Sequence, residues 1–427
     1  MTKYLQQKTL FGPQIAQRPA IDLGLVVVIP CHDEKYVIES LSSLKKCSLP
    51  PCSVEVIVVV NHGENAPSKI IETNQNTYRQ LLDWCTSNST PRLKFFPLYH
   101  DSLPKKHAGV GLARKIGMDE ATWRLEKSNN SKGIIACFDA DSKAQKNYLS
   151  AIFQHFLKLP NTQACSIHYE HPLQGIEHPP DVYKAIIQYE LHLRYYIQAQ
   201  RYAGFPFAYQ TIGSSMAVRA DAYQLQGGMN KRKAGEDFYF LHKFIESGYF
   251  SELTDTTVIP SPRPSDRVPF GTGKAVNTHL QTKEDLTTYA IDSFDDLKIF
   301  FAKYDLFYKQ PFGELLTQIP DSVRAFLQSI NAEKNWLELH QNTSDLNSFK
   351  KRFFRWFNAF MLMKYVHYSR DHFYPDMPVL DASIALIKRL DLSLPRGTHR
   401  EHLIFWRELD KKPKNNLSKT PNTFPSK

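Results

Sequence analysis

Two aspartates, Asp139 and Asp141, follow the apolar run 133–138 and are the residues of this chain best suited to chemistry. The run predicts a buried strand, and side chains two residues apart on an extended chain point the same way. Two carboxylates held so close repel each other unless a cation lies between them. Mg²⁺ and Mn²⁺ take oxygen ligands and are commonly shared between carboxylates and the phosphates of a substrate. The pair therefore predicts a divalent metal site (Mg2+ or Mn2+); the alternative is an ordinary Asp pair that caps the next helix.

A second pair of acids, Glu236 and Asp237, follows Gly235 at the start of a helical pattern. Acidic residues are favoured at a helix N-terminus by the helix dipole, so a simple cap is one interpretation. A carboxylate at an exposed helix start can also take the proton from a hydroxyl group that attacks a substrate. The two interpretations are compatible, and Asp237 is a candidate general base.

Basic residues in two polar segments are candidates for binding phosphate. Lys105, Lys106 and His107 precede the glycine-containing segment 109–117, and Arg263 and Arg267 lie in the Pro/Gly-rich segment 261–273. Arginine can clamp a phosphate through two parallel N–H bonds. The alternatives are a solvated basic loop for the first segment and a domain linker for the second.

Strand-like and helix-like patterns that could position these residues alternate over the first 170 residues. We expect strands at 25–29, 54–60, 93–98 and 133–138, and helices at 36–46, 68–85 and 111–125. This alternation predicts parallel βαβ units with helices on both faces of the sheet. Ligands bind beyond the carboxyl ends of such strands, where the polar segments 30–34, 61–64 and 139–142 lie.

The remainder of the chain is predicted to be mainly helical. A helix rich in Tyr and His is expected at 179–202, and helical, aromatic patterns follow from about residue 285. We expect an N-terminal arm at 1–22, an α/β domain at 23–280, a helical region at 281–411 and a disordered basic tail at 412–427. Within the helical region, 350–357 mixes cations with aromatic residues; it predicts a core helix, with contact to a membrane surface as the alternative.

The composition indicates a soluble globular protein, with 42% hydrophobic and 22% charged residues. The chain contains no apolar run of the roughly 18 residues that a spanning helix needs, and its first residues lack a signal peptide pattern, so we expect a cytoplasmic protein. Peripheral contact with the inner face of the membrane stays open. The six cysteines show no C-x-x-C spacing and predict no disulfide or zinc framework. Residues 411–427 supply half of the net charge of +10, and the remainder suits anionic substrates rather than nucleic acid.

Five segments, taken in order, resemble the family 2 glycosyltransferases, which use nucleotide-sugar donors and have the GT-A fold. The segments are V-I-P-C-H-D-E at 28–34, V-V-V-N-H-G at 58–63, G-V-G-L-A-R-K-I-G at 109–117, D-A-D at 139–141 and G-E-D-F at 235–238. The resemblance covers residues 23–275. It implies an α/β fold of GT-A type with a mainly parallel sheet, extended here by a helical C-terminal region.

The resemblance also implies a reaction and its residues. A hexosyl group would pass from a nucleoside diphosphate donor to the hydroxyl of a glycan, a lipid-linked or a small-molecule acceptor, with Asp237 as base, Glu236 beside it, and inversion at the sugar carbon. The metal would be held by Asp139 and Asp141. The residues expected to bind the nucleotide sugar are Pro30, His32, Glu34, Asn61, Lys106, Arg114, Asp139 and Arg267. Asn61 stands where the family usually has Asp, which leaves the identity of the base open.

The sequence leaves three alternatives to this reaction. A retaining transferase would share the metal site without using Asp237, and a non-catalytic partner protein would bind nucleotide sugars without turnover. A dinucleotide site at Gly109–Gly111 is disfavoured because a true fingerprint directly follows the first strand of its unit. His168, His171 and His279 are candidates for an extra metal ligand, although a single His is more often structural.

Overall fold

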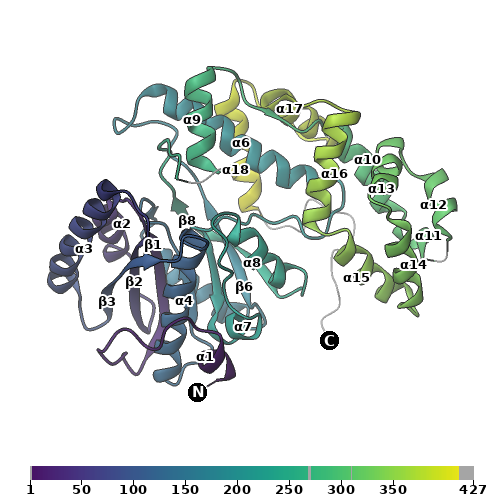
Figure 1. The fold of residues 1–427 in the computed structure, drawn as a ribbon. Coiled ribbons are helices and arrows are strands. Elements are labelled where there is room, and N and C mark those ends of the chain that lie inside the picture. Colours follow the sequence, from purple (N-terminus) through teal and green to yellow (C-terminus); the bar gives the residue numbers. More distant parts are fainter. Residues whose placement is uncertain (1, 268–270, 309, 413–427) are drawn as a thin grey trace. The chain divides into compact units, whose positions relative to one another are not determined.

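The computed structural model describes residues 2–267, 271–308 and 310–412. The chain divides into two compact units (Figure 1). The first consists of residues 1–175 and 210–274, and the second of residues 176–209 together with the chain from Ala275 on. Segment 176–209, expected within the α/β domain, thus groups with the C-terminal helices. The predicted disordered tail, apart from Lys412, lies outside the described residues.

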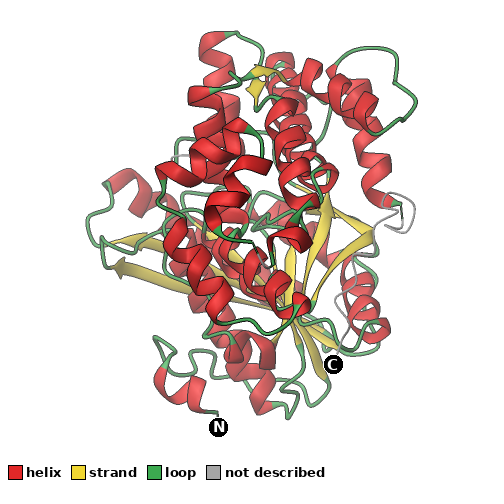
Figure 2. Cartoon of the chain, turned by 90° about the vertical axis from the view of Figure 1, so that its right-hand side faces the viewer, coloured by secondary structure: helices red, strands yellow, loops and turns green. Residues whose placement is uncertain are grey.

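The first unit contains a mixed sheet with the strand order β3-β2-β1-β4-β7-β6-β8-β5 (Figure 2, strands in yellow). The strands are β1 Leu23–Cys31, β2 Ser53–Gly63, β3 Leu93–Leu103, β4 Ile134–Cys137, β5 Lys143–Ala144, β6 Ala164–Tyr169, β7 Met216–Arg219 and β8 Phe250–Ile259. Strands β1 to β4 are parallel, β7 is antiparallel to both β4 and β6, β8 is parallel to β6, and β5 is antiparallel to β8. The carboxyl ends of β1, β2, β4, β6 and β8 therefore share one edge.

Helices connect the parallel strands as the alternating pattern predicts. These connecting helices are α2 Val37–Lys45, α3 Ser68–Asn88 and α4 Val110–Lys127. The unit also contains α1 Lys3–Gln7 in the N-terminal arm, α5 Tyr148–Lys158, α7 Ala220–Leu225 and α8 Glu236–Ile245. The chain moves from β1 to β2 to β3 and then returns across the sheet to β4. Right-handed crossovers place α2 and α3 on one face and α4 on the other. The predicted fold class, mixed α/β with a mainly parallel central sheet, is confirmed.

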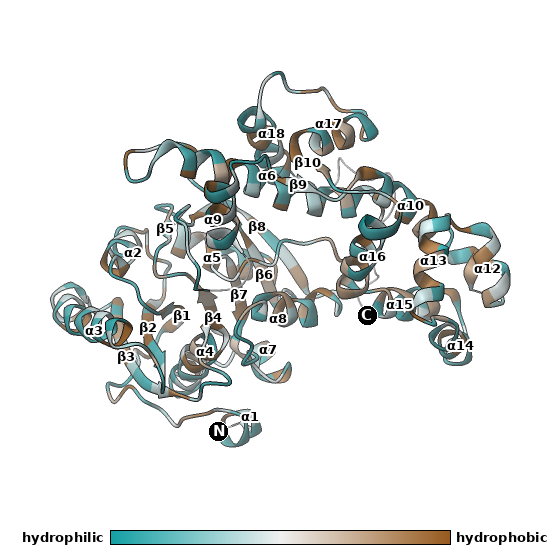
Figure 3. Ribbon diagram, turned by 45° about the horizontal axis from the view of Figure 1, so that its top comes forward, coloured by the Kyte–Doolittle hydropathy of each residue, from teal (hydrophilic) through white to brown (hydrophobic). Residues whose placement is uncertain are grey.

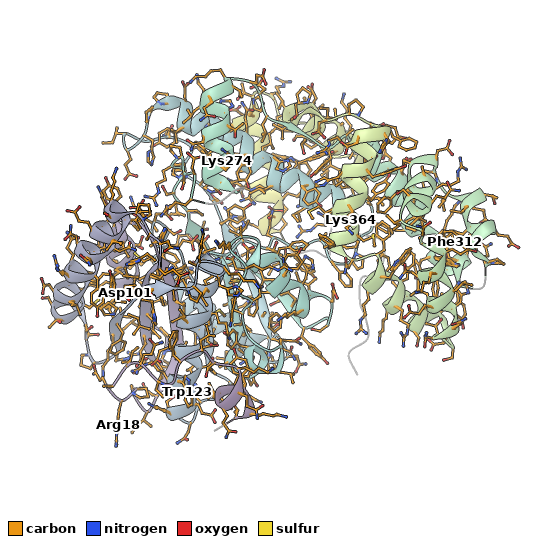
Figure 4. The ribbon with its side chains drawn as sticks, viewed as in Figure 1. Arg18, Asp101, Trp123, Lys274, Phe312 and Lys364 are labelled. Carbon is orange, nitrogen blue, oxygen red and sulfur yellow. The ribbon has the colours of Figure 1, made fainter. Side chains whose placement is uncertain are left out.

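The core of this unit is built from Val- and Ile-rich strands covered on both faces. In β1, residues 23–29 are buried, and β2 is buried from Ser53 to His62. Figure 3 shows hydrophobic colours along these central strands. Each fully buried aliphatic side chain of this size contributes roughly 1.5–3 kcal/mol of transfer free energy. The sheet is thus a rigid base for the polar segments at its edge.

The N-terminal arm is attached to α4 by polar contacts. The Tyr4 hydroxyl donates to Asp119 at 2.7 Å, and the Gln14 backbone N–H donates to the Glu120 carboxylate at 2.8 Å. Arg124 donates to the Gln17 carbonyl oxygen at 3.0 Å. Asp119, Glu120 and Arg124 are all buried, so the arm satisfies charged groups that the helix directs away from solvent.

The second unit is helical within the described residues, apart from a two-stranded pairing of β9 Thr287–Thr288 with β10 Met377–Pro378. Its helices are α6 Pro180–Tyr202, α10 Ile291–Ala302, α11 Tyr304–Phe307, α12 Phe312–Gln318, α13 Asp321–Ser329, α14 Glu333–Gln341, α15 Leu346–Trp356, α16 Ala359–His372, α17 Val379–Arg389 and α18 His399–Lys411; α9 Thr272–Thr282 begins just before it. Buried Glu190 on α6 accepts hydrogen bonds from Arg407 on α18, at 2.8 and 2.5 Å. This ion pair explains why α6 groups with the C-terminal helices.

Helix α15 packs its aromatic side into the core of the second unit. Phe349, Phe353 and Phe354 are buried, whereas Lys351, Arg352 and Arg355 are exposed. The interpretation of this segment as a core helix is therefore confirmed. Among the described residues, no helix combines the length and the apolar character needed to cross a membrane.

Candidate active site

Polar side chains from four segments gather beyond the shared edge of the sheet. His32 and Glu34 follow β1, Asp139 and Asp141 follow β4, and the segment with Arg263 and Arg267 follows β8. Asn61 is the third residue from the end of β2. The parallel strands bring these segments together because their carboxyl ends point the same way. Strand β4 ends at Cys137, so both aspartates lie in the turn after the strand rather than in it.

On one side of the site, two arginines hold Glu34 and Asp141. Arg263 forms an ion pair with Glu34, whose side chain is 1% exposed, and its Nη2 lies 3.0 Å from Oδ2 of Asp141. Arg267 lies 3.7 Å from Glu34 and 3.8 Å from Asp141, and donates to the carbonyl oxygen of His32 at 2.7 Å. The segment after β8 is thereby fastened to the loop after β1.

Asp141 is held in an environment that favours its neutral form. Burial, helped by the nearby carboxylates of Asp139 and Glu34, raises the pKa of Asp141 to about 6 against the opposing effect of Arg263. Mutual repulsion between Asp139 and Asp141 is the condition expected of a pair that shares a cation. The two carboxylates are thus close enough to interact, although each also contacts an arginine.

Arg114 on α4 connects the two pairs of acids. Its Nη2 lies 2.6 Å from Oδ1 of Asp139, and its Nη1 forms an ion pair with Glu236 at the start of α8. The side chains of Arg114 and Glu236 are 4% and 3% exposed, whereas that of Asp139 is 37% exposed. One buried guanidinium therefore bridges the acid that follows β4 and the acid that begins α8.

The environment of α8 raises the proton affinity of both acids at its start. Burial raises the pKa of Glu236 to about 7, with Arg114 opposing the rise and Asp237 adding to it. Burial likewise raises the pKa of Asp237, and Arg114 again opposes the rise. Asp237 is partly buried and accepts a hydrogen bond from the Phe238 backbone N–H at 2.8 Å. A carboxylate with a raised pKa is better suited to accept a proton near neutral pH than an ordinary aspartate.

Gly213 provides the space that the Arg114 guanidinium occupies. A Cβ atom at position 213 would lie 2.4 Å from Nη1 of Arg114, far inside van der Waals contact. The segment before β7 can approach the bridge between Asp139 and Glu236 this closely only because it has no side chain there.

Asn61 offers a buried hydrogen-bonding group at the end of β2. Its backbone carbonyl oxygen accepts from the Asn74 side chain at 2.9 Å and lies 2.8 Å from Nδ1 of His32. Its side-chain Oδ1 is buried and has no hydrogen-bond partner among the described residues. Because an unpaired buried acceptor is costly, this oxygen is a candidate contact for a ligand.

Within the described part of the chain, the other residues predicted for the site form no ion pair with the acids and arginines described above. Pro30 is partly exposed in β1, and Lys106 is exposed on the turn that follows β3, outside the two ion-pair groups around Arg114 and Arg263. His168 lies inside β6 and its Nε2 is 2.9 Å from Glu170. Within the described residues, no group of three or more His, Cys, Asp or Glu side chains could hold a metal ion. A metal at Asp139 and Asp141 would therefore take its other ligands from phosphate oxygens and water, as Mg²⁺ commonly does.

Two residues of α3 were not predicted to take part in the site. The side-chain oxygen of Asn74 accepts the Asp33 backbone N–H at 2.9 Å, and the Thr77 hydroxyl donates to the Glu34 carbonyl oxygen at 2.8 Å. Both are buried polar residues on the helix face that also carries Leu81. Polar residues on the apolar face of an amphipathic helix are the signal that could have identified them.

Among known proteins, this chain is similar only to solved structures, and not to a family model or a characterised sequence. Residues 1–349 of Staphylococcus aureus TarS in complex with UDP-GlcNAc are similar with 15% identity over 78% of this chain and 91% of that one, at a TM-score of 0.39. The complex of the same TarS segment with UDP gives 15% identity, coverages of 82% and 91%, and a TM-score of 0.37. At these values the likenesses carry no argument about function, which rests on the geometry described above.

Proposed function

We propose that this chain is a glycosyltransferase that moves a sugar from a nucleoside diphosphate donor to a hydroxyl acceptor with the help of a divalent metal. The observation that supports this most is the Arg114 bridge, which joins Asp139 to Glu236 and so makes one site of the two pairs of acids. Donor and acceptor must meet within one site, because transfer requires the attacking oxygen to lie about 3–3.5 Å from the sugar carbon.

Donor binding is assigned to the edge formed by β1, β2 and β8. The free Oδ1 of Asn61 can accept a hydrogen bond from the base or ribose, and Arg263 and Arg267 can contact the diphosphate. A metal held by Asp139 and Asp141 would stabilise the negative charge of the departing diphosphate. The exposed part of the Asp139 side chain is consistent with that role.

Acceptor activation is assigned to Asp237. Its carboxylate takes the proton of the acceptor hydroxyl while the acceptor oxygen bonds to the sugar carbon. The bond from that carbon to the phosphate oxygen breaks, and the nucleoside diphosphate leaves with the bonding electrons. Attack from the face opposite the leaving group inverts the sugar carbon. Glu236 keeps its contact with Arg114 and acts as a positioning residue.

A transferase that holds the diphosphate by arginine alone is the second candidate. One observation favours it: Arg263 lies 3.0 Å and Arg267 lies 3.8 Å from the Asp141 carboxylate. Arginine can neutralise a diphosphate without a metal, since its guanidinium forms paired hydrogen bonds with phosphate. The two candidates differ in their response to removal of divalent cations.

The test is donor hydrolysis and transfer with UDP-, GDP-, ADP- and dTDP-sugars, each with Mn²⁺, Mg²⁺ or EDTA. We expect one donor to be hydrolysed only with a metal, and Asp141→Asn to lose most of that activity. Full activity in EDTA would favour the arginine-only candidate. Asp237→Asn should bind the donor and fail to transfer, and full transfer by this variant would refute the base assignment.

A matched control removes an exposed aspartate of the second unit. Asp371 pairs with its neighbour Arg370 at 2.7 Å, and its side chain is 54% exposed. Asp371→Asn changes the same functional group as Asp237→Asn and Asp141→Asn, so it should keep the activity of the unmodified chain.

A further inference from the structure

Three consecutive cations lie just before the acids that begin α8, with two residues between. Lys231, Arg232 and Lys233 are all exposed, and no carboxylate of the described residues forms an ion pair with them. Like charges in one short segment repel, and the potential that they create attracts anions. Uncompensated charge of this density beside a site therefore points to an anionic ligand.

The segment is held in place rather than projecting freely into solvent. The Asn230 side chain donates to the Glu236 carbonyl oxygen at 2.8 Å and accepts the Arg232 backbone N–H at 3.1 Å. At position 111, a Cβ atom would lie 2.3 Å from the Arg232 carbonyl oxygen, so the segment packs closely on the start of α4. These contacts fix the three cations next to the helix that carries Asp237.

Arg232 is itself oriented by an aromatic ring of α8. Its guanidinium carbon lies 3.9 Å from the centroid of the Tyr239 ring, a cation–π contact. An arginine restrained in this way loses less conformational entropy when it binds a carboxylate or phosphate through paired hydrogen bonds. The contact with Tyr239 holds the Arg232 guanidinium beside α8.

These cations lie on the acceptor side of the Arg114 bridge. Arg114 contacts Asp139 with one nitrogen and Glu236 with the other, and the segment 230–233 contacts the Glu236 end. The other end of the bridge is Asp139, two residues before Asp141. Arg263 and Arg267 lie near Asp141 and can provide the cations for a diphosphate. The diphosphate of the proposed donor thus has two arginines near it, which leaves the cations at 231–233 available to a different ligand.

We propose that Lys231, Arg232 and Lys233 bind a phosphate or carboxylate group of the acceptor, so that the acceptor of this transferase is an acidic molecule. This inference rests on the proposed function, since it names the class of acceptor for that reaction. The three cations hold the acidic group while a hydroxyl of the same molecule reaches Asp237.

The test compares two variants that each remove three positive charges. One carries Lys231→Ala, Arg232→Ala and Lys233→Ala, and its matched control carries Ala at Lys351, Arg352 and Arg355, the exposed cations of α15. The basic tail is present in both, so its contribution to binding anions cancels. Fluorescently labelled polyphosphate, alginate and dextran serve as phosphate, carboxylate and neutral probes, and binding is measured by fluorescence anisotropy.

We expect the 231–233 variant to bind at least one of the two acidic polymers at least about tenfold more weakly, since each exposed contact contributes up to about fivefold in affinity. The α15 control should stay within about twofold of the unmodified chain. The difference should shrink as salt screens the contacts, and dextran should not distinguish the proteins. Weakening with polyphosphate alone assigns a phosphate-bearing acceptor, and weakening with alginate alone assigns a carboxylate-bearing one.

Equal loss in both variants, or no loss in the 231–233 variant, would overturn the inference. It would also be overturned if the 231–233 variant raised the KM for the donor in hydrolysis, because the cations would then serve the diphosphate. Failure of the proposed function is distinct, since it would be seen as absence of donor hydrolysis by the unmodified chain with every donor and metal.

Discussion

Replacement of Arg114 by Met should change how the stability of the chain depends on pH. In the unmodified protein the pKa of Glu236 is raised to about 7 from its ordinary value of 4.5, with burial raising it and Arg114 opposing the rise. A raised pKa means that the native state binds the proton more tightly than the unfolded state does. The free energy of unfolding therefore falls as pH rises from about 4.5 to about 7, and this fall then levels off.

The Met variant removes the charge that limits the rise in the Glu236 pKa. Glu236 then stays protonated to higher pH, so the fall in unfolding free energy continues above pH 7 at about 1.4 kcal/mol for each pH unit. Around pH 6 the Glu236 carboxyl is largely protonated in both proteins, so its titration contributes nearly the same amount to the free energy of unfolding of each. By about pH 9 the two profiles should have diverged by roughly 2–3 kcal/mol, which approaches the 3–5 kcal/mol typical of a broken buried ion pair.

The assay is urea unfolding at pH values from about 5 to 9, followed by tryptophan fluorescence. The same comparison in a Glu236→Gln background is the control, because glutamine does not titrate and most of the divergence should disappear. Asp237 adds an effect of the same sign, since Arg114 also opposes the rise that burial causes in its pKa. The bridge between Arg114 and Glu236 would be refuted if the unmodified protein and the Arg114→Met variant gave parallel profiles. It would also be refuted if the divergence were as large in the Glu236→Gln background.

Three further substitutions test packing. Gly213→Ala should cost about 1–3 kcal/mol and displace Arg114, because the new Cβ would lie 2.4 Å from its guanidinium; unchanged urea unfolding would contradict this. Tyr4→Phe removes the 2.7 Å hydrogen bond to Asp119 and should cost roughly 1 kcal/mol in thermal unfolding, with no change expected if the arm were detached. Phe353→Ala empties a fully buried site in α15 and should cost about 3–5 kcal/mol, whereas a surface position would tolerate the change.

The four strands β1 to β4 could be predicted because short apolar runs between helical patterns identify buried parallel strands. The interactions of Asp139 and Asp141 could not be predicted, since they follow from where β4 ends. A strand ending at Phe138 was expected, but β4 ends at Cys137, so strand alternation does not decide how the two side chains point. Each aspartate instead contacts a different arginine, and residues 114 and 263 are distant from both in sequence.

The division of the chain was harder to predict than its elements. Periodicity identified a helix at 179–202, which the structure confirms as α6, but periodicity does not show which surface such a helix packs against. The partner of its buried Glu190 is Arg407, 217 residues further along the chain. A pairing over that distance leaves no local pattern, so the sequence places α6 in the α/β domain by its position alone.

The attachment of the N-terminal arm to α4 has a practical consequence for anyone who shortens this protein. A chain starting at residue 23, where the first strand begins, would leave Asp119, Glu120 and Arg124 without contacts that Tyr4, Gln14 and Gln17 provide. The same helix carries Arg114 less than two turns before Asp119. Removing a segment far from the reacting groups in sequence would thus loosen the helix that joins the two halves of the site, and loss of activity after trimming would reflect that helix rather than a missing catalytic residue.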